Sequence, residues 1–144
     1  MATSVDNLKK IGENTMIEVG MTYKTTIKVE EKDTAKEVGS GTLLVLATPK
    51  MIALMEESAY KAIASELEEG TSSVGTLMNV KHISATPVGM EVYATATVTN
   101  VDGRKVEFLV EAFDECGKIG EGTHERFIVY ENKFVEKTYS KLNK

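Results

Sequence analysis

The sequence is poor in cysteine, histidine and proline, and each shortage excludes a class of protein. Its 144 residues include one cysteine, Cys116, so an internal disulfide is excluded and a reducing cytoplasm is the simplest compartment. Two histidines and one cysteine form no zinc-binding set at a recognisable spacing. With two prolines and eleven scattered glycines, no linker divides the chain. We therefore expect one domain without a metal site.

Long apolar runs, basic charge and several well-known motifs are also missing. No stretch approaches the roughly 18 apolar residues that span a bilayer, and residues 1–14 lack the apolar core of a secretory signal. The chain has 22 acidic and 17 basic residues and a net charge of −5, which disfavours nucleic-acid binding. The sequence contains no phosphate-loop GK[ST] motif and no G-x-S-x-G elbow. We therefore expect neither a membrane nor a nucleic acid as partner.

The clearest secondary-structure signal is a helix over residues 49–67. Thr48 is a preferred N-cap residue, Pro49 suits the first helical position, and Gly70 follows the end. Between them, apolar residues recur at helical spacing: Ile52, Met55, Ala59, Ala62 and Ile63. This pattern is typical of a helix that packs one face on a core.

Strand-like segments lie on both sides of this helix. A first strand is expected over residues 21–29, and residues 42–47 form a strand or an extended segment. After Gly70 the pattern predicts further strands over residues 74–83, 91–101, 105–114 and 119–130. The short turns between them require antiparallel neighbours. The order of elements predicts an α+β fold, in which the long helix lies along the concave face of an antiparallel sheet and is largely buried.

The polar chain ends set the limits of the predicted domain. Residues 1–15 are expected to form a flexible N-terminal segment, and residues 137–144 a polar C-terminal tail. The segment that starts at Glu131 is either a short helix or irregular chain. Residues 16–136 then form the single domain.

Glu56 is the first candidate for chemistry. The residues three and four positions away from it on the predicted helix are all uncharged, whereas Glu57 has Lys61 one turn further on, an ordinary exposed pair. An ionised carboxylate on the apolar side of a helix is costly unless it has a partner or a function. Glu56 is therefore either a boundary residue that reaches the rim of the helix, or a general base or nucleophile.

Other polar residues allow both a structural and a functional interpretation. His82 ends a predicted strand. It is either a hydrogen-bonded core residue, or a hydrogen-bond donor or proton carrier beside the helix. His124 and Arg126 share one face of the last strand, which is either solvated or lets Arg126 bind a carboxylate or phosphate. Thr48 caps the helix, where free N–H groups also polarise a carbonyl group.

Three segments carry a family resemblance. They read ATPKMIALMEESA at residues 47–59, VGTLMNVKHISATPVG at residues 74–89 and GTHERFIVY at residues 122–130. Together they resemble the hotdog-fold acyl-CoA thioesterases of the fluoroacetyl-CoA thioesterase-like group, over about residues 18–136.

The resemblance implies a set of site residues, a reaction and an assembly. In that group a threonine, a glutamate and a histidine form the catalytic set, which corresponds here to Thr48, Glu56 and His82. Gly75 matches a glycine that lines the thioester pocket, and Arg126 matches an active-site arginine. The implied reaction is hydrolysis of an acyl-CoA to the free acid and CoA, without a metal or a redox cofactor. The implied fold is a hotdog domain that forms at least a homodimer.

Two observations refine this implication. Members specific for fluoroacetyl-CoA carry a longer, aromatic-rich lid, whereas residues 36–46 here read KEVGSGTLLVL, which favours another short or medium acyl group. On one regular helix, Thr48 and Glu56 are eight residues apart, about 12 Å, and can hardly touch one reacting carbonyl. We therefore expect a pocket between two subunits, unless the helix starts late and Thr48 folds back.

Two alternative functions stay open from the sequence. The first is an acyl-CoA binding or sensing protein without turnover. The second is a small-ligand carrier of cystatin-like shape, in which His82 and Glu56 are structural. A hotdog hydratase is a nearer relative, but its usual aspartate–histidine helix motif is not visible.

Overall fold

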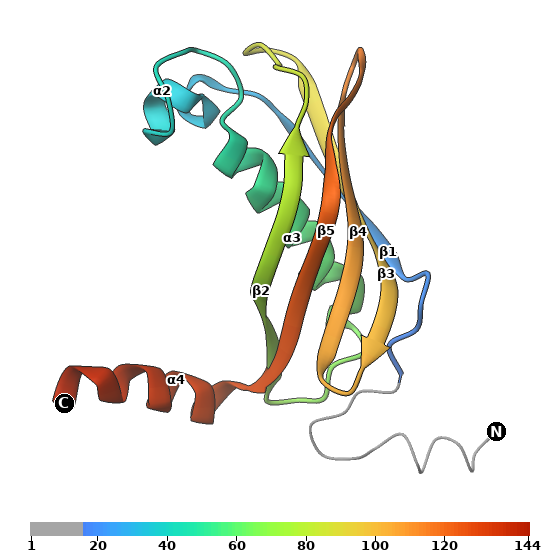
Figure 1. Ribbon diagram of the computed structural model, residues 1–144, viewed down its shortest axis with the longest axis vertical. Helices are drawn as coiled ribbons and strands as arrows, with labels where there is room; N and C mark the ends of the chain where they lie inside the picture. The colour runs from blue at the N-terminus through green and yellow to red at the C-terminus, as the bar shows by residue number, and fades with distance from the viewer. Residues whose placement is uncertain (1–15) are drawn as a thin grey trace.

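A computed structural model describes residues 16–144, in which one antiparallel sheet packs against a long helix (Figure 1). The strands are β1 (Thr22–Lys28), β2 (Thr71–His82), β3 (Glu91–Asp102), β4 (Lys105–Asp114) and β5 (Gly117–Tyr130). Their order across the sheet is β1-β3-β4-β5-β2, so β2 pairs with the last strand and lies at one edge. The predicted α+β class is confirmed.

One face of the long helix, α3 (Thr48–Ala64), packs on the sheet and forms the core with it. The buried helix residues are Met51, Leu54, Met55, Ser58, Ala59 and Ile63. They meet the inward residues of β3 and β4, which alternate along each strand: Val92, Ala94, Ala96, Val98, Val106, Phe108, Val110 and Ala112. The other face of α3 stays exposed at Ala53 and Tyr60. The helix is therefore buried along one face only.

The bounds of α3 differ from the prediction at both ends. Thr48 is the first residue of the helix and Ala47 is the N-cap, with no capping side chain. The prediction of Thr48 as N-cap is wrong, because its hydroxyl contacts His82 instead. The helix ends at Ala64, because the N–H groups at positions 66 and 67 bond three residues back, which is tighter than an α-helix.

The strands lie close to their predicted positions. β4 has the predicted bounds, β3 is longer by one residue, and β2 begins three residues earlier. The strand or extended segment expected over residues 42–47 is found only at its end: residues 42–44 are bends, and Val45 and Leu46 form isolated bridges to Pro87 and Thr34. Gly103 closes the β3–β4 hairpin with a φ of 64°, a conformation that favours glycine. Periodicity and turn chemistry thus located the sheet correctly.

The remaining elements lie at opposite ends of the sheet (Figure 1). Two short elements, η1 (Glu31–Asp33) and α2 (Ala35–Val38), lie near the start of α3, whereas α4 (Glu131–Tyr139) and η2 (Ser140–Asn143) extend away at the other end. The segment after Tyr130 is thus a helix, which continues past the predicted boundary at residue 136. The predicted flexible segment, residues 1–15, lies outside the described residues. Within residues 16–144, no helix has the length and apolar character needed to span a membrane.

Candidate active site

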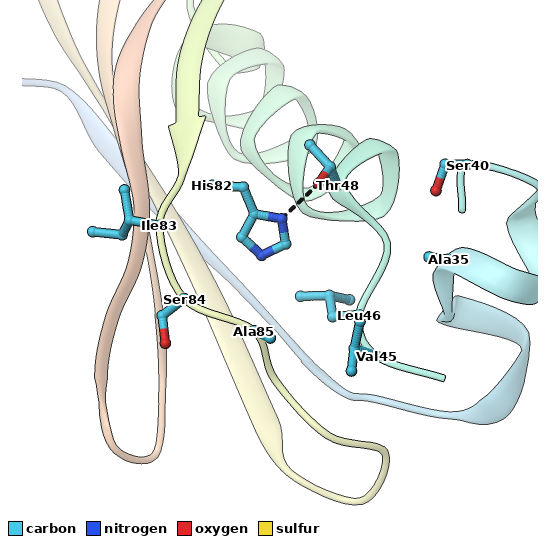
Figure 2. Close-up of a pocket in the computed structure, with 9 residues that line it drawn as sticks. All are labelled: Ala35, Ser40, Val45, Leu46, Thr48, His82, Ile83, Ser84 and Ala85. Atoms are coloured by element: carbon cyan, nitrogen blue, oxygen red, sulfur yellow. Dashed lines mark hydrogen bonds between the residues drawn. The ribbon is translucent and has the colours of Figure 1, made fainter. Parts of the chain in front are cut away.

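The first group of candidate residues joins the start of α3 to the end of β2. Thr48 Oγ1 lies 2.7 Å from His82 Nδ1 (Figure 2). Thr48 is exposed and His82 is half-buried. Just before the helix, the Leu46 N–H donates to the Thr86 carbonyl oxygen at 2.9 Å, which ties the entry of α3 to the chain that follows β2. The fold therefore brings together two residues that are far apart in the sequence.

The second ring nitrogen of His82 is unused. Its Nε2 is buried and has no hydrogen-bond partner among the described residues. Burial lowers the pKa of His82, which the Ser84 backbone opposes in part, so the imidazole is neutral at pH 7. If the Thr48 hydroxyl donates to Nδ1, then Nε2 carries the proton; with the opposite direction, Nε2 is an acceptor. In both tautomers, Nε2 keeps a hydrogen-bonding capacity that no described residue uses.

An open pocket of about 280 Å³ lies beside this pair (Figure 2). Its walls come from the segment before α3, the start of the helix and the chain after β2. The lining residues are Ala35, Ser40, Val45, Leu46, Thr48, His82, Ile83, Ser84 and Ala85. Segment 36–46 thus contributes to the wall, and every side chain that it contributes is small or aliphatic.

The second group lies two turns further along α3 and contains Glu56, Gly75 and Arg126. Gly75 and Arg126 face each other across β2 and β5, and Glu56 approaches from the helix. A methyl group built on Gly75 would lie 2.9 Å from Glu56 Oε2 and 3.4 Å from Arg126 Nη1. Both charged side chains therefore converge on this exposed glycine. They also line one pocket, of about 320 Å³.

Glu56 lies at the edge of the buried face of α3. It is half-buried, and its helical neighbours Ala53 and Tyr60 are exposed. The structural interpretation, a boundary glutamate, is therefore right about its position. Its carboxylate nevertheless lies at a pocket beside a buried cation, as the functional interpretation requires. The adjacent Glu57 pairs with Lys61 at 2.7 Å, as predicted.

Arg126 is a buried cation that one serine of β2 holds on one edge. The residue is 7% exposed. Its Nε donates to Ser73 Oγ at 2.8 Å, and its Nη2 donates to the Ser73 carbonyl oxygen at 3.0 Å. Burial lowers the pKa of Arg126 and the Glu56 carboxylate opposes this effect; a guanidinium group stays charged at neutral pH. The interpretation of this strand face as solvated is wrong.

His124 is buried still more deeply, with 1% of the residue exposed. Its Nδ1 lies 2.8 Å from the Leu77 carbonyl oxygen, and its Nε2 lies 3.2 Å from Arg126 Nη1. Its ring stacks on Phe108, with 5.8 Å between centroids. The two-residue spacing placed His124 beside Arg126, but its other partners depend on the pairing of β2, β4 and β5. The sequence analysis missed Ser73, because its contact with Arg126 also depends on the pairing of β2 with β5.

The structure brings the five predicted site residues together as two groups rather than one. Thr48 and His82 form one group, and Glu56, Gly75 and Arg126 form the other. The two groups line different pockets. Eight residues of regular helix, about 12 Å, separate Thr48 from Glu56. One subunit therefore holds two separate groups of candidate residues, which we call the two half-sites.

Comparisons with known sequences point to one family. The family model described as fluoroacetyl-CoA-specific thioesterase matches residues 29–132. The fluoroacetyl-CoA thioesterase of Streptantibioticus cattleyicolor is 42% identical over 97 residues, which cover 67% of this chain and 70% of that protein.

Solved structures agree with this assignment. A structure of the fluoroacetyl-CoA thioesterase FlK matches with a TM-score of 0.83 and 34% identity, over 87% of this chain and 97% of that chain. A Thermus thermophilus hypothetical protein, described as a thioesterase superfamily member, matches with a TM-score of 0.80 and 30% identity, over 88% and 93% of the two chains. A hot-dog-like protein from Thermanaerovibrio acidaminovorans matches with a TM-score of 0.81 and 25% identity, over 89% and 95%. The predicted hotdog fold is confirmed, and the chain belongs to the fluoroacetyl-CoA-specific thioesterase family.

Proposed function

We propose that the protein hydrolyses a short or medium acyl-CoA to the free acid and CoA. The observation that carries this proposal is the Glu56 carboxylate, which lies at an open pocket beside buried Arg126 in a chain of this family. Structures of the relative FlK hold fluoroacetate with CoA in one case and acetyl-CoA in another. These ligands of the relative support a CoA thioester as the substrate class here.

Glu56 provides the nucleophile by one of two routes. As a general base it takes a proton from water, and the water oxygen attacks the thioester carbonyl carbon. The carbon–sulfur bond then breaks, and the CoA thiolate leaves and takes up a proton. As a direct nucleophile, the carboxylate attacks the same carbon, and the carbon–sulfur bond breaks as the CoA thiolate leaves. Water then hydrolyses the resulting mixed anhydride to the free acid and the Glu56 carboxylate. Both routes need only a nucleophile and charge stabilisation, so we propose no metal or redox cofactor.

Thr48 and His82 stabilise the oxyanion that forms on the carbonyl oxygen. At the start of α3, Pro49 has no N–H group, and the N–H groups of Lys50 and Met51 donate to the Ala47 carbonyl oxygen. The Thr48 N–H is therefore the first-turn donor without a partner inside the helix, and it attracts negative charge. The His82 Nε2 adds a donor when the Thr48 hydroxyl donates to Nδ1. The hydroxyl of Thr48 thus selects the tautomer, and His82 contacts the oxyanion.

Gly75 and Arg126 bind the substrate next to Glu56. The missing side chain of Gly75 leaves space where the carboxylate and the guanidinium group converge. The positive charge of Arg126 lies beside the Glu56 carboxylate and attracts negative charge on the substrate. This is the role of the second half-site in the proposed reaction.

A homodimer joins the two half-sites. β2 pairs only with β5 in residues 16–144, so its other edge can pair with a second copy of the chain, and Leu77 on this strand is 50% exposed. In the proposed dimer, Thr48 and His82 face the partner subunit's Glu56. A protein that sediments as a monomer and keeps full turnover would contradict this arrangement.

The acyl pocket and the compartment follow from the same residues. Segment 36–46 lines the pocket at Thr48 with Ser40, Val45 and Leu46, which supports a short or medium acyl group other than the fluoroacetyl group. Cys116 is exposed and unpaired, which fits the reducing cytoplasm that we propose.

Release of free thiol from a panel of acyl-CoAs tests the proposal. We expect turnover for acyl chains of short or medium length, and a loss of about 10²–10⁴ in kcat for Glu56→Ala. Glu69→Ala makes the same change at an exposed site in the turn after α3 and should keep full activity. If the parent protein releases no thiol, and Glu56→Ala only changes the affinity for acyl-CoA, the protein is a binding protein instead.

A further inference from the structure

We propose that His124 is a positioning residue, which as a neutral imidazole holds the Arg126 guanidinium group in place beside Glu56. His124 does not line the pocket of Glu56 and Arg126, although its Cε1 lies 3.2 Å from a methyl group built on Gly75. Its polar contact at this point is with Arg126, so it acts through Arg126. The inference rests on the proposed function and deepens it, because it assigns a role in the second half-site to His124, a residue that the proposed reaction does not use.

The hydrogen bonds of His124 fix its tautomer. The Leu77 carbonyl oxygen, 2.8 Å from Nδ1, can only accept, so Nδ1 carries the proton. Arg126 Nη1, 3.2 Å from Nε2, can only donate, so Nε2 presents a lone pair. The neutral Nδ1–H form satisfies both contacts, and a second proton on Nε2 would break the contact with Arg126.

His124 controls the edge of the guanidinium group that Ser73 leaves free. Ser73 accepts from Nε and Nη2, which lie on one edge of the planar group. His124 accepts from Nη1, which lies 3.4 Å from a methyl group built on Gly75 and therefore points toward the convergence point with Glu56. Without His124, nothing among these contacts fixes Nη1 at the pocket.

A neutral acceptor suits this position better than a charged one. A carboxylate there would pair with Arg126 and compete with Glu56, whereas a charged imidazole would repel the guanidinium group. Burial lowers the pKa of His124; the Leu77 carbonyl oxygen opposes this shift and Arg126 adds to it. Glu56 on α3 and Glu125 on β5 raise the pKa, and β4 contributes the uncharged ring of Phe108. The surroundings as a whole keep the ring neutral at pH 7.

Two variants of His124 separate its two hydrogen bonds. In His124→Gln, the amide oxygen reaches the place of Nε2 and still accepts from Arg126. In His124→Asn, the amide reaches only the place of Nδ1, so it bonds to Leu77 but not to Arg126. We expect kcat/KM to stay within about threefold in His124→Gln and to fall about 10- to 100-fold in His124→Asn. Equal losses in two variants of matched thermal stability would overturn the proposal.

A double-mutant cycle with Arg126→Ala tests whether His124 acts through Arg126. If it does, His124→Asn has no further effect on kcat/KM in the Arg126→Ala background. Losses that multiply in the double variant would contradict the positioning role and indicate a general structural role.

A readout without turnover separates this inference from the proposed function. The ¹⁵N shifts of the imidazole nitrogens of His124 should show the neutral Nδ1–H tautomer at pH 7. An Nε2–H or charged ring in an active protein would overturn the positioning role alone. A protein that shows the Nδ1–H tautomer but hydrolyses no acyl-CoA would refute the proposed function and, with it, the catalytic effect of His124.

Discussion

The two half-sites of one subunit differ in how completely their polar atoms are paired. At the start of α3, Thr48 and His82 share a single hydrogen bond, and His82 Nε2 lacks a partner in the described part of the chain. Around Arg126, three N–H groups have acceptors, and both ring nitrogens of His124 are bonded. From this difference we expect the first half-site to gain a partner from its ligand, and the second to keep its geometry before a ligand binds.

Removal of the His82 imidazole, whose Nε2 is the unpaired atom of the first half-site, should have the largest effect on activity. We expect His82→Ala to lower kcat by about 10²–10³ without a comparable change in KM, because its Nε2 acts on the oxyanion rather than on the bound substrate. Thr48→Val keeps the ring but removes its partner, so it should cost less. Steady-state thiol release measures both. A rise in KM with kcat unchanged for His82→Ala would indicate that His82 only binds the substrate.

A small displacement of the Glu56 carboxylate in the second half-site should lower activity almost as much. Glu56→Asp keeps the charge but withdraws the carboxylate by one methylene group from the point where it meets Arg126 above Gly75. We expect kcat/KM to fall about 10²-fold, since a shift of this size misplaces a general base or nucleophile. Activity close to that of the parent protein would show that this half-site tolerates a shift and is not preorganised.

Filling the space above Gly75 should have a smaller effect. An added methyl group would lie 2.9 Å from Glu56 Oε2, so the carboxylate must move, but the Gly75 backbone does not require glycine. We expect Gly75→Ala to lower kcat/KM about tenfold at unchanged thermal stability. By contrast, Gly122→Ala places its methyl group against the backbone of Asn79 and Val80 and should destabilise the fold. Unchanged kinetics in Gly75→Ala would contradict the convergence of charged groups at this point.

The stability of the fold should depend weakly on pH through the two histidines. Burial lowers the pKa of His82 and of His124, so an unfolded chain takes up protons near pH 6.5 that the folded chain binds only at lower pH. The unfolded state then binds more protons, and the free energy of unfolding falls as the pH falls from 7 to 5. Measured by urea denaturation, the free energy of unfolding should fall less between pH 7 and pH 5 in His82→Gln than in the parent protein. A midpoint independent of pH in this range would contradict two neutral buried rings.

The sequence predicted most of the fold because local patterns determine it. Helical spacing located α3, and alternation with glycine-containing turns located β3, β4 and β5 to within two residues. The start of α3 was misplaced by one residue, because capping statistics cannot include a tertiary contact such as that between Thr48 and His82.

The candidate site was only partly predictable for the same reason. Glu56 was recognisable from its uncharged helical neighbours. Arg126 was assigned to the site through the family resemblance, since its spacing to His124 shows only that the two share a strand face. The partners of Arg126 depend on long-range pairing, since Ser73 lies on β2 and 53 residues away in the sequence. The burial of His124 also depends on the order of the strands across the sheet, which the spacing of residues in the sequence does not determine. Chemistry carried by one element was therefore visible, and chemistry assembled between elements was not.

The most direct test of the account asks whether the two half-sites of different subunits form one active site. The inactive variants Glu56→Ala and His82→Ala are denatured together and refolded as a mixture. If sites are shared between subunits, each mixed dimer has one intact site, and random pairing should restore about one quarter of the normal thiol release. If the mixture, with mixed dimers verified by mass spectrometry, stays as inactive as its parts, the shared site is contradicted.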